Sequence, residues 1–163
     1  MPYIIDGHNL IPQLGLDLSS IDDEESLIGV ILEYSRQARL GQVEIYFDNG
    51  QPGQAERQKR GTLTIVFTRR PMIADQAISN RLFMLKKDAK NWTVVSSDRK
   101  VQAEAKSAGA RVISSDQFSG MVMNQLAKSK PGKTHEHGKL SEAEVEKWLH
   151  IFEQSEQKNK NSY

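Results

Sequence analysis

Apolar residues fall into two patterns that alternate along the chain: short runs that are mostly apolar, and positions spaced three or four residues apart. The short runs predict buried strands, and the wider spacing predicts amphipathic helices. Strands are expected at residues 3–5, 43–47, 63–67, 92–95 and 111–113. Helices are expected at residues 21–40, 72–87, 99–107 and 115–127, with Ser115 as the N-cap of the last one. This alternation predicts an α/β fold with a mostly parallel sheet covered on both faces.

Breaks in the pattern divide the chain into one domain and an appendage. Residues 1–127 form the expected α/β domain, within which the Gly- and Gln-rich stretch 49–61 is interpreted as a loop. A basic linker is expected at 128–140. Ser141 starts a capping-box pattern, which predicts a C-terminal helix at 141–155 and a frayed tail at 156–163.

Composition excludes several classes of site. The 163 residues include no cysteine, which rules out disulfides, cysteine-ligated zinc and thiol nucleophiles. No apolar run approaches the roughly 20 residues needed to span a bilayer, and the N-terminus lacks a signal-peptide pattern. We therefore expect a soluble, cytoplasmic protein that does not enter a membrane.

The small net charge of +1 hides an uneven distribution of charge. Residues 1–55 carry 9 acidic and 2 basic side chains, whereas residues 56–100 carry 4 acidic and 11 basic side chains. A central segment this basic would suit a polyanion such as RNA. An ordinary solvated surface on which the charges happen to cluster explains the distribution equally well.

Aspartates follow three of the expected strands. Asp6, Asp48 and Asp98 each come at a strand end, and Asp75 lies in the first turn of the helix that follows another strand. Parallel strands end at one edge of a sheet, so these carboxylates can converge there and raise each other's pKa. Carboxylates and water are the ligands of hard divalent cations, which can activate water for phosphodiester cleavage. A single Asp here would more simply cap a helix or start a turn; several on one edge favour a magnesium or manganese site.

The first of these aspartates belongs to a distinctive short motif. Gly7 follows Asp6 directly, where its backbone freedom would let a substrate approach closely. Asn9 lies three residues after the carboxylate and could orient it or a bound water.

Four segments together resemble the YacP-like group of NYN-domain proteins, within the PIN-like nuclease superfamily. They are YIIDGHNLI, the strand ending in FDN, the helix opening IADQAISNRL, and VVSSDRKVQAEAKSAGARV, and the C-terminal LSEAEVEKWLHIF is also similar. The resemblance implies a PIN-like three-layer sandwich with a C-terminal helical extension. It also implies a metal-dependent endoribonuclease that uses Mg²⁺ or Mn²⁺ on RNA, with ribosome association left open.

The same resemblance assigns roles to individual residues. Asp6, Asp75 and Asp98 match the acidic metal-site positions, and Asn9 matches the motif asparagine. Asp48 follows a matching strand, with direct metal contact left open. His8 stands where an aromatic residue is common in this motif, a difference expected to alter substrate contacts rather than the metal site.

Six basic side chains near the acidic edge are the candidates for contacts with the RNA backbone. They are Arg57, Lys59, Arg60, Arg69, Arg70 and Arg99. Such contacts provide affinity rather than sequence preference, and solubility is the competing role for these charges. Two other functions stay open: a non-cleaving RNA- or ribosome-binding module of the same fold, and a phosphatase or DNA nuclease that uses the same acids.

Overall fold

The computed structural model describes residues 1–16, 22–50 and 53–128. The expected helix at 141–155, the tail at 156–163 and all but the first residue of the expected linker lie outside this part of the chain.

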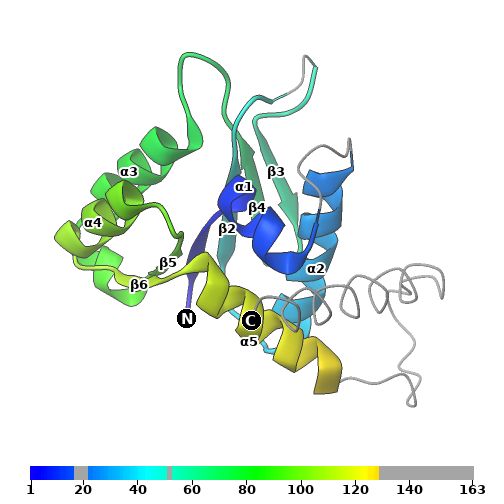
Figure 1. The fold of residues 1–163 in the computed structure, drawn as a ribbon. Helices are drawn as coiled ribbons and strands as arrows, with labels where there is room; N and C mark the ends of the chain where they lie inside the picture. Colours follow the sequence, from blue (N-terminus) through cyan, green and yellow to red (C-terminus); the bar gives the residue numbers. More distant parts are fainter. Residues whose placement is uncertain (17–21, 51–52, 129–163) are drawn as a thin grey trace, which may run out of the picture.

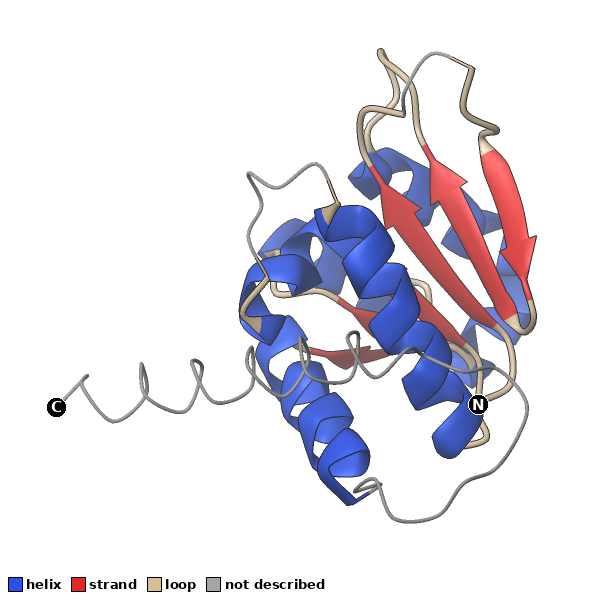
Figure 2. Cartoon of the chain, turned by 90° about the vertical axis from the view of Figure 1, so that its right-hand side faces the viewer, coloured by secondary structure: helices blue, strands red, loops and turns tan. Residues whose placement is uncertain are grey.

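One six-stranded sheet forms the centre of the domain. Its strands are β1 (Tyr3–Asp6), β2 (Val43–Phe47), β3 (Arg57–Arg60), β4 (Leu63–Phe67), β5 (Thr93–Val95) and β6 (Arg111–Ile113). They lie in the order β3-β4-β2-β1-β5-β6, and every neighbouring pair is parallel except β3 and β4. Figure 2 shows the arrow of one strand pointing opposite to its neighbours at one side of the sheet. The expected mostly parallel sheet is confirmed.

The expectation of a loop throughout residues 49–61 was wrong, because β3 lies within that stretch. Arg57 pairs with Val66 and Arg60 with Leu63, and Gly61 makes the tight turn between the strands with a φ of +60°. Only Gly adopts that backbone conformation without strain. The side chains of β3 are all polar and alternate between exposed and half-buried, so the strand has no apolar pattern.

Helices cover both faces of the sheet and produce three layers (Figure 1). On one face lie the short helices α1 (Gly7–Leu10) and η1 (Ile11–Leu14), together with α2 (Asp23–Gln37) and α5 (Ser115–Lys128). On the other face lie α3 (Ala74–Leu85) and α4 (Arg99–Ser107). Alternate residues of each strand face opposite layers: Ile5 and Ile45 pack toward α2, whereas Ile4 and Tyr46 pack toward α3.

Several helix boundaries differ from expectation: α2 ends at Gln37 rather than at residue 40, and α3 begins at Ala74 rather than at residue 72. The N-cap of α5 is Ser114 rather than Ser115, because the Ser114 hydroxyl accepts a hydrogen bond from the Gln117 amide at 3.1 Å. The helix expected through residue 87 ends as α3 at Leu85 and continues as the 3₁₀ helix η2 (Lys86–Asn91).

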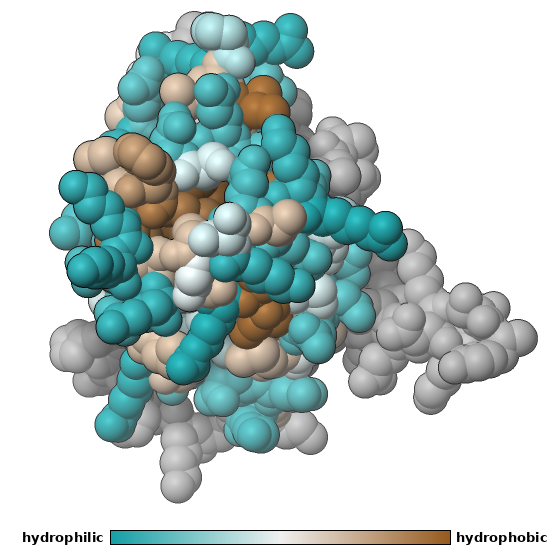
Figure 3. Space-filling view, turned by 90° about the vertical axis from the view of Figure 1, so that its left-hand side faces the viewer, coloured by the Kyte–Doolittle hydropathy of each residue, from teal (hydrophilic) through white to brown (hydrophobic). Residues whose placement is uncertain are grey.

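The outer surface of α3 and α4 is mostly hydrophilic. Figure 3 shows this side of the molecule, where hydrophobic surface occurs in separate small patches between polar side chains. Phe83 and Met84 on α3 are the most exposed large apolar side chains of the described residues, at 78% and 71%. In the part of the chain that the structure describes, no helix combines the length and the apolar character needed to cross a membrane.

Candidate active site at the carboxyl edge of the sheet

Four aspartates from separate elements lie near one another at the carboxyl ends of the parallel strands. Asp6 ends β1, Asp48 directly follows β2, Asp98 precedes α4 after β5, and Asp75 lies in the first turn of α3. The negative charges of Asp75, Asp48 and Asp98 all act on Asp6. The strand order also reverses at β1, the position at which open α/β sheets bind ligands.

Asp6 has the most perturbed carboxyl group of the site. Its side chain is only 6% exposed, and burial raises its pKa more than any other effect. The neighbouring carboxylates raise it further, while a hydrogen bond donated by the Ser96 hydroxyl at 3.1 Å lowers it. The resulting pKa is about 6, well above the ordinary 3.8. The folded protein therefore disfavours the ionised form of Asp6, first because the group is buried and then because of the neighbouring carboxylates.

Asp75 experiences the same crowding more weakly. Burial raises its pKa first, and the charges of Asp98 and Asp48 add to that effect. Lys100, in the first turn of α4, lowers the pKa of Asp75. Lys100 is therefore a cation of the site that the sequence analysis did not select, although it directly follows Arg99.

Asp98 also fixes the start of α4. Its Oδ1 accepts hydrogen bonds from the backbone amides of Lys100 at 2.8 Å and Val101 at 3.3 Å, which makes it the N-cap. Its own amide donates to the Ser96 hydroxyl at 3.1 Å, and that hydroxyl donates to Asp6. Ser96 thus connects two of the four aspartates.

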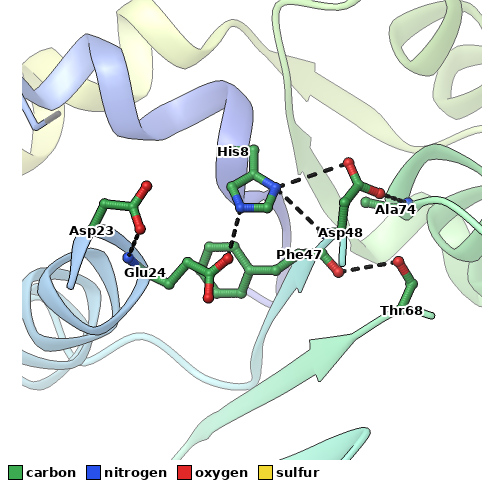
Figure 4. A network of polar contacts seen from close by, with 7 residues as sticks. All are labelled: His8, Asp23, Glu24, Phe47, Asp48, Thr68 and Ala74. Atoms are coloured by element: carbon green, nitrogen blue, oxygen red, sulfur yellow. Dashed lines mark hydrogen bonds and ion pairs between the residues drawn. The ribbon is translucent and has the colours of Figure 1, made fainter. Parts of the chain in front are cut away.

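Asp48 is held by contacts with two different layers (Figure 4). Its Oδ1 accepts a hydrogen bond from the Ala74 amide at the start of α3, and its Oδ2 lies 3.9 Å from His8 Nδ1. The Asp48 amide donates to the same Nδ1 at 3.3 Å, so the imidazole proton is on Nε2, which donates to Glu24 at 2.8 Å. His8 therefore links α2 to the loop that carries Asp48.

Replacing His8 by phenylalanine tests this link. The variant His8→Phe keeps a ring against Phe47, which His8 contacts edge-on, but loses both hydrogen bonds. We expect urea denaturation to show a loss of about 1–2 kcal/mol in the free energy of unfolding. Glu24→Gln retains an acceptor for Nε2–H and serves as the control, with an expected change below about 0.5 kcal/mol. Equal stability of His8→Phe and the wild type would contradict a positioning role for this imidazole.

Asn9 connects segments that are far apart in the sequence. Its Oδ1 accepts hydrogen bonds from the Ser97 amide at 2.7 Å and from the Ser115 hydroxyl at 2.6 Å. The Ser115 amide donates in turn to the Ser97 hydroxyl at 3.0 Å. Within residues 1–16, 22–50 and 53–128 the Asn9 amide NH₂ group makes no hydrogen bond, so it can meet a water or a substrate there.

Gly7 is required for a different reason from the one expected. Its φ is not positive, so backbone freedom is not what the position needs. A Cβ atom here would lie 2.3 Å from Cε1 of Phe47, a distance that real Cβ atoms do not tolerate. The close approach is to the protein's own core.

The six candidate RNA-binding cations are not equally placed. Arg60 forms a bidentate ion pair with Glu25, and Arg57 lies 3.9 Å from the buried Glu44. Arg69 and Arg70 lie in the loop after β4 and Arg99 begins α4, so these three are at the carboxyl edge of the sheet. Lys59 is exposed on β3.

The aspartates supply the oxygen donors that hard divalent cations prefer. Across residues 1–16, 22–50 and 53–128, however, no three Asp, Glu or His side chains are close enough together to hold one ion directly. Mg²⁺ usually retains several waters and uses one or two carboxylates. The donor set therefore fits a hydrated cation better than an ion enclosed by protein ligands.

Comparisons with known proteins place the chain in a family. The model of the YacP-like NYN domain matches residues 3–159. Two crystal structures of Rae1 (YacP) from Bacillus subtilis, one of them of a mutant, each have a TM-score of 0.62 and 22% identity to this chain. They cover 92% (the mutant) and 98% of this chain, and in both cases the match spans 91% of the Rae1 chain.

No curated protein sequence gives a match. The similarity to the solved structures confirms the expected PIN-like α/β fold, and the family model confirms the resemblance seen in the sequence motifs. The fold is that of an RNase-type nuclease, and the chain belongs to the YacP-like NYN domain family.

Proposed function

We propose that this protein is a divalent-metal-dependent endoribonuclease that hydrolyses RNA phosphodiester bonds at the aspartate cluster. The observation that supports this most directly is the convergence of four aspartates at the carboxyl edge of the sheet, where burial and then the charges of Asp75, Asp48 and Asp98 raise the pKa of Asp6. Such crowding of carboxylates is costly unless a cation is bound. The RNase-type nuclease fold of the family supports RNA as the substrate.

In this proposal Asp6, Asp75 and Asp98 hold Mg²⁺ or Mn²⁺, directly or through water. When bound, the cation would lower the pKa of a coordinated water and offset the charge of the phosphate. Ser96 keeps Asp6 and Asp98 oriented through the hydrogen bonds that connect them.

Groups around the cluster would act on the water and on the RNA. In this proposal the Asn9 amide and the second oxygen of Asp48 would orient the attacking water. Arg99 and Lys100 would meet the phosphates at the start of α4.

Replacing Asp98 by asparagine tests the proposal. Asparagine is also a good N-cap, so Asp98→Asn can keep the two amide hydrogen bonds at the start of α4 while losing the charge. We expect cleavage of a mixed RNA pool in Mn²⁺ or Mg²⁺ to fall by about 100-fold or more, and EDTA to abolish the wild-type reaction. The thermal unfolding midpoint should remain close to that of the wild type.

Asp88→Asn is the matched control, because Asp88 is exposed in η2 at the opposite edge of the sheet. Undiminished cleavage by Asp98→Asn would refute the assignment. RNA binding without cleavage in either metal, on free RNA and then on translating ribosomes, would instead identify a non-cleaving binding module. Faster hydrolysis of DNA or of small phosphoesters than of RNA would reassign the substrate.

A further inference from the structure

A pocket of about 400 Å³ is lined by Asn49, Gly50, Arg69 and Arg70. Asn49 directly follows Asp48, and the two arginines follow β4, so the pocket is at the same edge of the sheet as the aspartates. Its volume lies in the range of sites that bind small molecules. None of the roles proposed above for the aspartates uses this pocket.

Hydrogen bonds join the two loops that form the pocket. The Thr68 amide and hydroxyl both donate to the Phe47 carbonyl, at 2.8 and 3.2 Å. The Gly50 amide donates to the Thr68 carbonyl at 2.9 Å. These bonds hold the pocket walls before any ligand arrives, which lowers the entropic cost of binding.

The pocket also carries positive charge that is not neutralised within the described residues. There, Arg70 has no ion pair or hydrogen bond from its side chain, and Arg69 donates to the neutral carbonyl of Gln54. Arg57 and Arg60, by contrast, face Glu44 and Glu25. Two guanidinium groups beside an amide side chain suit a phosphate next to a polar base edge.

Apolar surface adjoins these cations. Met72 and Ile73 follow the arginines in the chain and are 40% and 47% exposed. A ligand with a charged phosphate and a flat, partly apolar base would contact both kinds of surface.

We propose that this pocket is a subsite for one nucleotide of single-stranded RNA, next to the nucleotide whose phosphate is cleaved. The inference rests on the proposed function for the position of the scissile phosphate. A pocket of this size has room for a single nucleotide, so the proposed subsite takes a nucleotide from an unpaired strand. Arg70 contacts the phosphate, and the Asn49 amide contacts the base.

The subsite is tested by measuring RNA binding under conditions in which no cleavage occurs. The probe is a fluorescently labelled single-stranded RNA of about 12 nucleotides, followed by anisotropy in EDTA between about 50 and 200 mM salt. Arg70→Ala is expected to weaken binding roughly tenfold and to reduce the slope of log K against log salt by about 0.7. Lys106→Ala removes the same charge from the last turn of α4, at the opposite edge of the sheet, and should change neither quantity.

The variant Asn49→Gly distinguishes binding of RNA in this pocket from binding to a charged surface. Asn49 has a φ of +56°, which glycine adopts without strain, so the variant removes the amide and preserves the backbone. Weaker binding of the single strand with an unchanged salt slope is expected. A duplex of the same sequence should bind more weakly to the wild type and be insensitive to this substitution.

The inference is overturned if Arg70→Ala behaves like Lys106→Ala, or if Asn49→Gly leaves single-strand binding unchanged. Because EDTA removes the metal, these results do not depend on catalysis. Metal-dependent cleavage with no effect of Arg70→Ala on binding would leave the nuclease in place and remove the subsite. The expected binding changes without cleavage in any metal would keep the subsite and reject the nuclease.

Discussion

Replacement of Asp6 by asparagine is expected to raise the free energy of unfolding by roughly 2–3 kcal/mol at pH 8 in EDTA. The ionised Asp6 carboxylate is buried among three other carboxylates, and its pKa of about 6 shows how strongly the folded state disfavours the charge. Asparagine is uncharged and can still accept the hydrogen bond from Ser96. The same variant should lose cleavage, because a charge that serves catalysis commonly costs stability.

The pKa of Asp6 also predicts how the free energy of unfolding changes with pH. The pKa of Asp6 is about 6 in the folded state and near 3.8 in the unfolded state. Between these values Asp6 holds more protons in the folded state than in the unfolded state, so its contribution to stability falls as the pH rises from about 4 through 6. The contribution of Asp6 becomes constant roughly one pH unit above its folded-state pKa, where the group is ionised in both states.

Urea denaturation at several pH values, with EDTA present, measures both effects. In Asp6→Asn the decline between pH 4 and 6 should shrink to the part contributed by Asp75, whose pKa is also raised. Asp88→Asn, a change at an exposed carboxylate, should follow the wild-type curve. An Asp6→Asn protein less stable than the wild type at pH 8 would contradict the electrostatic account of the site.

Replacement of Arg81 by methionine is expected to lower the free energy of unfolding by about 3–5 kcal/mol. Arg81 on α3 donates to the carboxylate of Glu44, which is fully buried on β2, with nitrogen–oxygen distances of 2.9–3.1 Å. Its guanidinium also lies 5.2 Å from the centre of the Trp92 ring. Methionine fills similar space but leaves a buried carboxylate without its main cation.

A double variant separates the loss of the ion pair from the loss of packing. Adding Glu44→Gln to Arg81→Met removes the unpaired charge and keeps an acceptor for the Tyr46 hydroxyl, which lies 2.7 Å from Glu44. The double variant should recover more than half of the lost stability in denaturant unfolding. A loss below about 1 kcal/mol in the single variant would show that water solvates Glu44 after the substitution.

The main strands and helices of the fold could be predicted because each carries a clear apolar period. β2 and β4 are mostly apolar, with Glu44 and Thr64 as their polar residues, and α2 buries Leu27 and Ile31 at helical spacing. β3 could not be predicted, since all four of its side chains are polar and its position depends on pairing with β4. The single helical turn α1 is likewise too short to show a period.

The gathering of acids could be predicted for a topological reason: parallel strands place their carboxyl ends together. The contacts that hold those acids could not. Asn9 meets Ser97 and Ser115, and His8 meets Glu24, across long separations in sequence that only the packing of the layers brings together. Local patterns carry no signal for such pairs. The pocket of Asn49 and Arg70 depends in the same way on two loops bonded side by side.

The polar strand β3 also bears on how copies of this protein meet one another. An outermost strand presents unpaired amides and carbonyls that can recruit a strand from another molecule and start aggregation. Here that strand is Arg-Gln-Lys-Arg, and the strand at the other side of the sheet, β6, has only three residues. Two copies brought together along β3 would face each other with like charges. The margins of the sheet thus protect the protein against sheet extension at the high local concentrations of a crowded cell.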